Sequence, residues 1–259
     1  MPASLCRMVF TGVAVALATL FDDRGDLDAA STAAHAARLL DHGIAAVVVA
    51  GTTGEAATLD PSERARLLAA VHDAVEGRVP VIAGTGAPSA RQAVDLTARA
   101  RAGGADAVLV LSPPHVADPR AYYGRVADAA GDTPVIAYHF PAVAPPGLAV
   151  HTIDALPVAG CKDSSGDAER LLATLRVTTV PLYTGSSALL SFAGPLGCAG
   201  AILALANVEP ERCRAAFDGD PSAQRGLTDA HLAMRNEFPA GLKQLMAKRF
   251  GTGTVTRAV

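Results

Sequence analysis

The sequence predicts an α/β fold, a (β/α)8 TIM barrel with a short C-terminal helical extension. Three observations indicate this fold. Eight short apolar runs recur along the 259 residues, and helical segments with clear start signals separate them. Most runs are continuously hydrophobic, as expected of parallel strands that are buried on both faces. A single domain of this length is also common among α/β barrels.

The predicted strands are spread along most of the chain, at residues 12–19, 45–51, 80–86, 105–113, 134–140, 158–163, 181–185 and 199–207. A doubly wound sheet is the alternative, but that fold usually carries a GxGxxG turn after its first strand. Residues 22–26 read Asp-Asp-Arg-Gly-Asp and lack that turn. The barrel is therefore the favoured fold.

The first apolar run has a second interpretation. Arg7 and the apolar residues after it, up to residue 21, resemble the start of a signal peptide. The run is shorter than the roughly 20 residues that a membrane helix needs. We favour a buried first strand and expect no association with a membrane.

Helix start signals lie between the predicted strands. Asp60 precedes Pro61, a favourable first helical residue, and Glu63 stands in the same first turn. Similar signals open helical segments at residues 88–104, from 118 onward and at 168–175, the last of them capped by Asp167; further helices are expected at 210–217, 222–237 and 241–250. We therefore predict a barrel over residues 1–208 and C-terminal helices over 209–259.

Composition excludes several classes of function. The net charge of −3 provides no basic surface for nucleic acid. The four cysteines, Cys6, Cys161, Cys198 and Cys213, lack metal-type CxxC spacing, and none of the seven histidines has ligand spacing. We expect reduced, buried cysteines and a cytoplasmic protein that needs no metal or cofactor.

Lys162 is the most informative residue. The chain has three lysines, and the other two, Lys243 and Lys248, lie close to its end. Lys162 stands where an apolar run meets a polar turn, which is the tip of a predicted strand. A desolvated lysine can lose its proton, which arginine cannot, and its neutral amine can form a Schiff base. The alternative is an ordinary surface lysine.

Two further strand ends carry suitable chemistry. The second predicted strand runs into Gly51-Thr52-Thr53-Gly54-Glu55, a turn whose N–H groups and hydroxyls could hold a carboxylate or could simply form a glycine-rich connection. On the fifth strand, alternation places Tyr138 on the face opposite His139. Tyr138 and Lys162 should therefore lie at similar heights on adjacent strands. We expect His139 to point outward.

Three motifs together resemble the pyruvate-dependent class I aldolase family, which includes dihydrodipicolinate synthase and N-acetylneuraminate lyase. They are residues 51–55, the Tyr-x-x-Pro of residues 138–141, and Gly-x-Lys-Asp-x-Ser-Gly-Asp at 160–167. The resemblance runs from residue 12 to about Lys243. It implies a lyase or synthase that joins a 2-oxo acid to an aldehyde, or that cleaves an aldol into these two products. It also implies a homo-oligomer of two or four chains.

The resemblance also implies roles for single residues. Lys162 is the Schiff-base lysine, Tyr138 the proton shuttle and Thr53 its relay. Substrate-binding positions are Gly51, Thr52, Thr53, His115, Val143, Gly185, Ser186 and Ile202, of which Thr52 and Thr53 take the substrate carboxylate.

Departures from the family pattern leave the reaction open. Val143 stands where dihydrodipicolinate synthase has an arginine for the second substrate's carboxylate, which argues against that activity. His115 takes the place of the family's second relay tyrosine. Either His115 relays the proton in its stead, or the relay is interrupted at this position. The C-terminal helices also look shortened. A dehydratase or hydratase-aldolase that uses the same iminium is one alternative, and a non-catalytic barrel with a binding or regulatory role is another.

Overall fold

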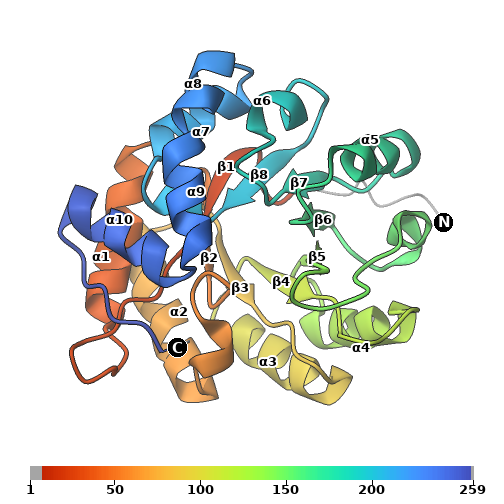
Figure 1. Ribbon diagram of the computed structural model, residues 1–259. Coiled ribbons are helices and arrows are strands. Elements are labelled where there is room, and N and C mark those ends of the chain that lie inside the picture. The colour runs from red at the N-terminus through yellow and green to blue at the C-terminus, as the bar shows by residue number, and fades with distance from the viewer. Residues whose placement is uncertain (1–7, 258–259) are drawn as a thin grey trace.

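The computed structural model describes residues 8–257, and these form a closed barrel of eight parallel strands that pair in chain order (Figure 1). The predicted fold is confirmed. The strands are β1 Gly12–Ala16, β2 Ala46–Val49, β3 Val81–Gly84, β4 Ala107–Leu111, β5 Val135–His139, β6 Gly160–Asp163, β7 Leu182–Thr184 and β8 Gly200–Leu203. All eight lie within the predicted apolar runs, and β8 stops where a short 3-10 turn, η3 Leu205–Asn207, begins.

Helices surround the ring of strands (Figure 1). Their bounds are α1 Ala29–Asp41, α2 Pro61–Val75, α3 Ala90–Ala102, α4 Arg120–Ala130, α5 Ala168–Val177, α6 Leu190–Ala193, α7 Pro210–Phe217, α8 Pro221–Gly226, α9 Thr228–Asn236 and α10 Ala240–Phe250, with a 3-10 turn η1 Ala56–Thr58 before α2. Asp60 and Glu63 form a complete capping box on α2, and the Asp167 side chain caps α5. These two start signals are confirmed.

Two connections differ from the prediction. The helix predicted at 222–237 is divided into α8 and α9, which meet at Leu227, a fully buried residue. Between β5 and β6 the connection contains only a 3-10 helix, η2 Val150–Ala155. Pro145, Pro146 and Gly147 precede η2, and consecutive prolines lack the N–H donors that an α-helix requires.

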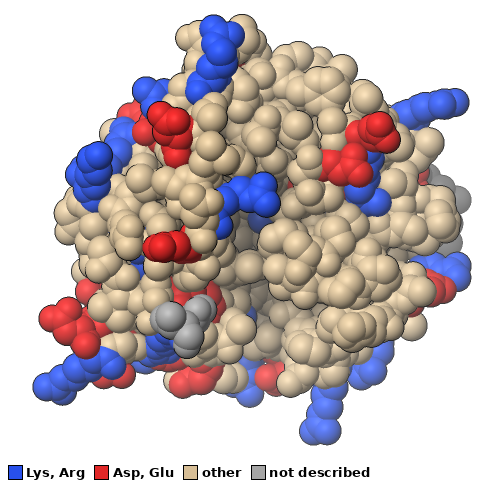
Figure 2. Space-filling model, in the orientation of Figure 1, with Lys and Arg blue, Asp and Glu red and all other residues tan. Residues whose placement is uncertain are grey.

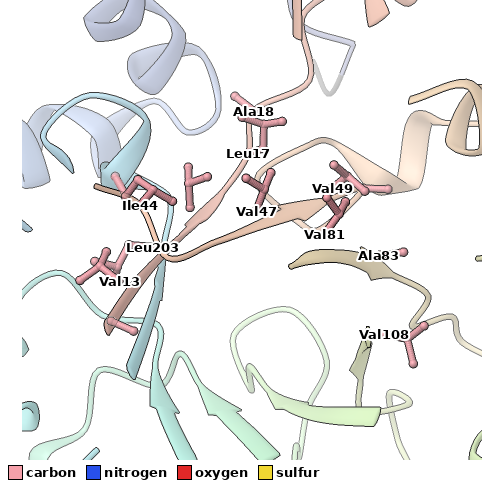
Figure 3. Packing of buried hydrophobic residues seen from close by; sticks show 14 of the residues in the cluster. Val13, Leu17, Ala18, Ile44, Val47, Val49, Val81, Ala83, Val108 and Leu203 are labelled. Carbon is pink, nitrogen blue, oxygen red and sulfur yellow. The ribbon is translucent and has the colours of Figure 1, made fainter. Parts of the chain in front are cut away.

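The larger part of the core lies between the strands and the helices. Figure 3 shows side chains from the outward faces of β1 to β4 and β8 converging there, among them Val13, Val47, Val81, Val108 and Leu203. Successive residues of a strand point to opposite faces, so these positions alternate with a second set that points into the barrel. The near-continuous hydrophobicity of each run follows from this double burial.

The cluster of side chains inside the barrel includes an aromatic pair. Tyr183 on β7 is fully buried and stacks on Phe10, with ring centroids 4.6 Å apart. Its hydroxyl donates to the carbonyl of Phe10 at 3.1 Å. A β-carbon at Gly160 would lie 2.8 Å from the Tyr183 ring, and one at Gly200 would lie 3.1 Å from it. The two glycines therefore make room for the Tyr183 ring.

Cys161, Cys198 and Cys213 are buried free thiols, as predicted, and Cys6 lies outside the described residues. No helix formed by residues 8–257 combines the length and the apolar character of a membrane span.

Candidate active site

Lys162 lies inside the barrel near the C-terminal end of β6. Its side chain is only 5% exposed, and the register of the sheet pairs it with Tyr138 on β5 and Tyr183 on β7. The predicted height and inward direction of Tyr138 and Lys162 are confirmed, because Tyr138 belongs to the inner cluster and Ala137 to the outer one. The alternative of an exposed loop lysine is excluded.

Burial changes the proton affinity of Lys162. It lowers the pKa of the amine from its ordinary value to about 7, because the charged form has lost its water. Within residues 8–257 none of the ion pairs involves Lys162, so no carboxylate offsets this loss. A large fraction of the amine is therefore neutral, and nucleophilic, at neutral pH.

The ring of Tyr138 packs against that amine. The Nζ atom of Lys162 lies 4.2 Å from the centre of the Tyr138 ring. Burial raises the pKa of Tyr138 to about 12, and hydrogen bonds from the side chains of Ser164 and Thr52 partly oppose this shift. The phenol therefore keeps its proton at neutral pH and can donate it.

Ser164 and Gly185 complete the wall beside Lys162. Ser164 follows Lys162 by two residues and lies next to Gly185, whose N–H donates to the carbonyl of Asp163 at 2.6 Å. A β-carbon on Gly185 would lie 1.9 Å from the Ser164 hydroxyl and 3.0 Å from the Lys162 side chain. Only glycine therefore allows β7 to pass this close to the amine.

The Thr52–Thr53 turn lies between two residues with left-handed backbone conformations. Ala50 has φ 50° and Glu55 has φ 53°, which residues other than glycine rarely adopt. Backbone bonds from Glu55 to Thr52 (3.1 Å) and from Ala56 to Gly51 (3.2 Å) close the turn. The Thr19 hydroxyl donates to the carbonyl of Gly54 at 2.7 Å. Thr53 is buried and Thr52 is half-buried.

The two threonines of the turn differ in their relation to Tyr138. Of the two, Thr52 is the one whose side-chain hydrogen bonding lowers the pKa of Tyr138, together with that of Ser164. The relay role of Thr53 and the carboxylate-binding roles of both residues stay predictions.

The other predicted binding residues divide into two groups. Ile202 on β8 belongs to the same inner cluster as Tyr138, and Ser186 directly follows Gly185. His115 and Val143 instead lie on exposed loops after β4 and β5, joined where the N–H of His115 donates to Pro145 at 2.6 Å. Their roles in substrate binding stay predictions.

His139 points out of the barrel, as predicted. Its Nδ1 atom accepts a hydrogen bond from the N–H of Leu148 at 2.8 Å, so it packs on the β5–β6 connection. Behind Lys162, the Asp163 carboxylate pairs with Arg170 of α5 at 2.7 Å and caps the turn at Ser165. These outward contacts hold the end of β6 in place.

Sequence reasoning missed two residues of this site. Ser164 could have been found, because a residue two positions after Lys162 continues the inward face of the strand. Tyr183 gave no comparable signal, since its role depends on the space left by glycines on two neighbouring strands.

Comparisons with known proteins agree on one family. Residues 9–256 match the Dihydrodipicolinate synthetase family. A DapA-like lyase of Halobacterium salinarum is 40% identical over 242 residues, which cover 90% of this chain and 79% of that protein. The 4-hydroxy-tetrahydrodipicolinate synthase of Pseudomonas aeruginosa is 37% identical over 235 residues, covering 85% and 80%.

A solved structure shows the same fold. YagE of E. coli K12, a prophage protein of the dihydrodipicolinic acid synthase family crystallised in complex with pyruvate, superposes with a TM-score of 0.85. It is 27% identical, and the match covers 96% of this chain and 91% of that one.

Proposed function

The chain belongs to the dihydrodipicolinate synthetase family of class I aldolase-type lyases and synthases, and on this premise we propose that it forms a Schiff base between Lys162 and pyruvate or another 2-oxo acid. One observation carries the proposal: a buried amine with a pKa of about 7 lies against a protonated phenol, that of Tyr138. The pyruvate complex of the related YagE supports the choice of substrate.

The covalent step follows from these two groups. The neutral amine of Lys162 adds to the keto carbon, C2, and a C–N bond forms while the carbonyl π bond breaks. The former carbonyl oxygen takes up two protons, one from the amine and one from solvent, and leaves as water; a protonated C=N bond, the iminium, remains. We assign the transfer of the amine proton to Tyr138, whose ring centre lies 4.2 Å from Nζ.

The iminium then serves as an electron sink. Loss of a proton from C3 gives an enamine that can attack an aldehyde carbon, and the reverse sequence cleaves a carbon–carbon bond. The iminium nitrogen accepts the electron pair in either direction, so no external oxidant or reductant is required.

We assign the substrate carboxylate to the Thr52–Thr53 turn. The turn lies at the end of β2, and it reaches the reaction centre through the hydrogen bond between Thr52 and Tyr138. Its hydroxyls and successive N–H groups are suitable donors for a carboxylate. The same hydrogen bond makes Thr52 the better candidate for the proton relay, in place of Thr53.

The second substrate is an aldehyde without the carboxylate that aspartate semialdehyde carries. Val143 is half exposed on the loop after β5 and cannot pair with an anion. Figure 2 shows a hollow in the middle of the visible face of the molecule, with a Lys or Arg side chain at its upper edge and mostly uncharged residues around the rest of its border. We therefore propose a lyase or synthase that is distinct from the enzyme of lysine biosynthesis. Assembly as a dimer or tetramer and a cytoplasmic location stay predictions.

Borohydride trapping tests the proposed function. Pyruvate plus borohydride should add one reduced pyruvyl group to the intact protein, and peptide mapping should locate it on Lys162. Lys162→Met should remove the adduct and Lys248→Met, on the exposed face of α10, should retain it. An unchanged mass, or an adduct on another residue, would contradict the proposal. Mass spectrometry with a panel of aldehydes then identifies the partner.

A further inference from the structure

Glu55 is a buried carboxylate at the end of the turn that follows β2. It directly follows Thr52, Thr53 and Gly54, yet it is only 4% exposed and adopts the left-handed backbone conformation. Its N–H donates to the carbonyl of Thr52, so a rotation of Glu55 would move Thr52 directly. A buried carboxylate in this conformation requires hydrogen-bond or ion-pair partners that compensate its charge and fix its backbone.

The end of the chain provides the partners. Lys243 of α10, which is fully buried, donates from Nζ to one carboxylate oxygen of Glu55 at 2.6 Å. The N–H of Arg257 donates to the other oxygen at 2.7 Å. Lys243 also donates to the carbonyl of Val255 at 2.6 Å, which ties the ion pair to residues 251–257, the C-terminal strap.

The strap is itself anchored on the barrel. Figure 1 shows it in dark blue, running from α10 toward α2. The Arg257 guanidinium binds both carboxylate oxygens of Glu63, at 2.7 and 2.9 Å, and the carbonyls of Gly25 and Thr58. The Phe21 ring lies against both cations, 4.5 Å from Nζ of Lys243 and 4.4 Å from the Arg257 guanidinium.

A buried ion pair contributes little to stability on average, because desolvation offsets most of the attraction, but it can select one conformation over others. Here the selected conformation is that of the turn that hydrogen-bonds Tyr138 through Thr52. We propose that Glu55 is a positioning residue, and that Lys243 and the C-terminal strap hold it so that Thr52 and Thr53 are placed to receive the substrate. The inference rests on the proposed function for the identity of that substrate.

The test uses three variants and one control. Lys243→Met removes the ammonium group and leaves Glu55 without it. The double variant Glu55→Gln/Lys243→Met removes both charges, so no uncompensated charge remains buried. Arg257→Gln weakens the anchor of the strap at a partly exposed position that the fold tolerates more easily. Arg249→Met is the matched control, because it removes an ion pair of the same helix, with Glu211 at 2.9 Å, away from the turn.

Two measurements separate positioning from general stability. Amide hydrogen exchange of residues 50–56 should accelerate in the three variants and stay unchanged in Arg249→Met. The pyruvate concentration that gives half-maximal borohydride trapping should rise about tenfold or more, as expected when binding groups are displaced. The double variant should regain the melting temperature lost by Lys243→Met without regaining pyruvate affinity.

The outcomes are distinguishable. Unchanged exchange of residues 50–56 in folded Lys243→Met would overturn the proposal, and so would a double variant that recovers both stability and affinity. If Lys243→Met does not fold, Arg257→Gln and the double variant decide by the same criteria. If the wild-type chain traps no pyruvate, the proposed function fails, and hydrogen exchange alone decides whether Glu55 positions the turn.

Discussion

The amine of Lys162 lies 4.2 Å from the centre of the Tyr138 ring, on two neighbouring strands that pair these residues in register. Burial acts on the two groups in opposite senses. It lowers the pKa of Lys162 to about 7 and raises that of Tyr138 to about 12, so each group is favoured in its neutral form. A nucleophile without its proton and a donor that retains its own are thus brought together.

The rate of adduct formation should depend on pH through Lys162. Only the neutral amine attacks, so the rate with pyruvate should rise about tenfold per unit below pH 7 and become level above it. Rapid-quench borohydride trapping between pH 5 and 10 measures this profile. A rate that increases tenfold per unit up to pH 9 or beyond would show that Lys162 has an ordinary pKa.

Stability should respond to the same group with a defined sign. The folded-state pKa of Lys162 lies below its unfolded value, so between about pH 7 and 10.5 the unfolded chain binds more protons and stability rises with pH. Lys162→Met should therefore stabilise the protein by a few kcal/mol at pH 6 and below, with a smaller gain at pH 10. Denaturant unfolding at the two pH values measures the gain. Lys248→Met, at an exposed site, is the control and should show no such pH-dependent gain.

The two threonines of the turn should differ in effect. Thr52→Val removes the side-chain hydrogen bond to Tyr138 and should lower turnover about tenfold, the equivalent of one hydrogen bond. Thr53→Val keeps that bond and should act mainly on the KM for the 2-oxo acid. Steady-state kinetics of both variants compares them. A larger loss of turnover in Thr53→Val would assign the relay to Thr53.

Gly185→Ala should nearly abolish adduct formation. The added methyl group would meet the Ser164 hydroxyl and the Lys162 side chain, and a displacement of this size can cost about a hundredfold in rate. Ser164→Gly removes the closer of the two obstacles, so the double variant should regain part of the activity. Equal activities of the single and double variants would show that the clash with Ser164 does not cause the loss of activity.

Val143→Arg should widen the choice of aldehyde toward anionic partners. A guanidinium on the half-exposed loop could pair with a second carboxylate and raise kcat/KM for aspartate semialdehyde about tenfold relative to uncharged aldehydes. Competition between the two aldehydes, followed by mass spectrometry, measures the ratio. Val143→Gln, which adds length without charge, should leave the ratio unchanged.

Sequence patterns predicted the elements of this fold better than the contacts between them. Alternation along β5 and β6 is a local property with a period of two, and it correctly turned Tyr138 and Lys162 inward and His139 outward. The capping signals at Asp60 and Asp167 were equally local and equally reliable.

The rest of the site depends on closure of the barrel. Lys243 and Glu55 are 188 positions apart, so no local pattern pairs them. The division of residues 222–237 at Leu227 likewise reflects tertiary burial of that side chain, which overrides the helical preference of the segment.

The packing of Tyr183 on Phe10 has a kinetic consequence. Phe10 precedes β1, so the stacked rings occupy the barrel interior toward the N-terminal ends of the strands, and we expect substrates to reach Lys162 from the C-terminal ends. The second substrate should then bind above the one that reacts with Lys162. We therefore expect an ordered mechanism. The 2-oxo acid binds before the aldehyde, and in the cleavage direction it is released after the aldehyde. Product-inhibition patterns should then show that the 2-oxo acid binds to the free enzyme, and that the aldehyde binds only to the enzyme that already holds the 2-oxo acid.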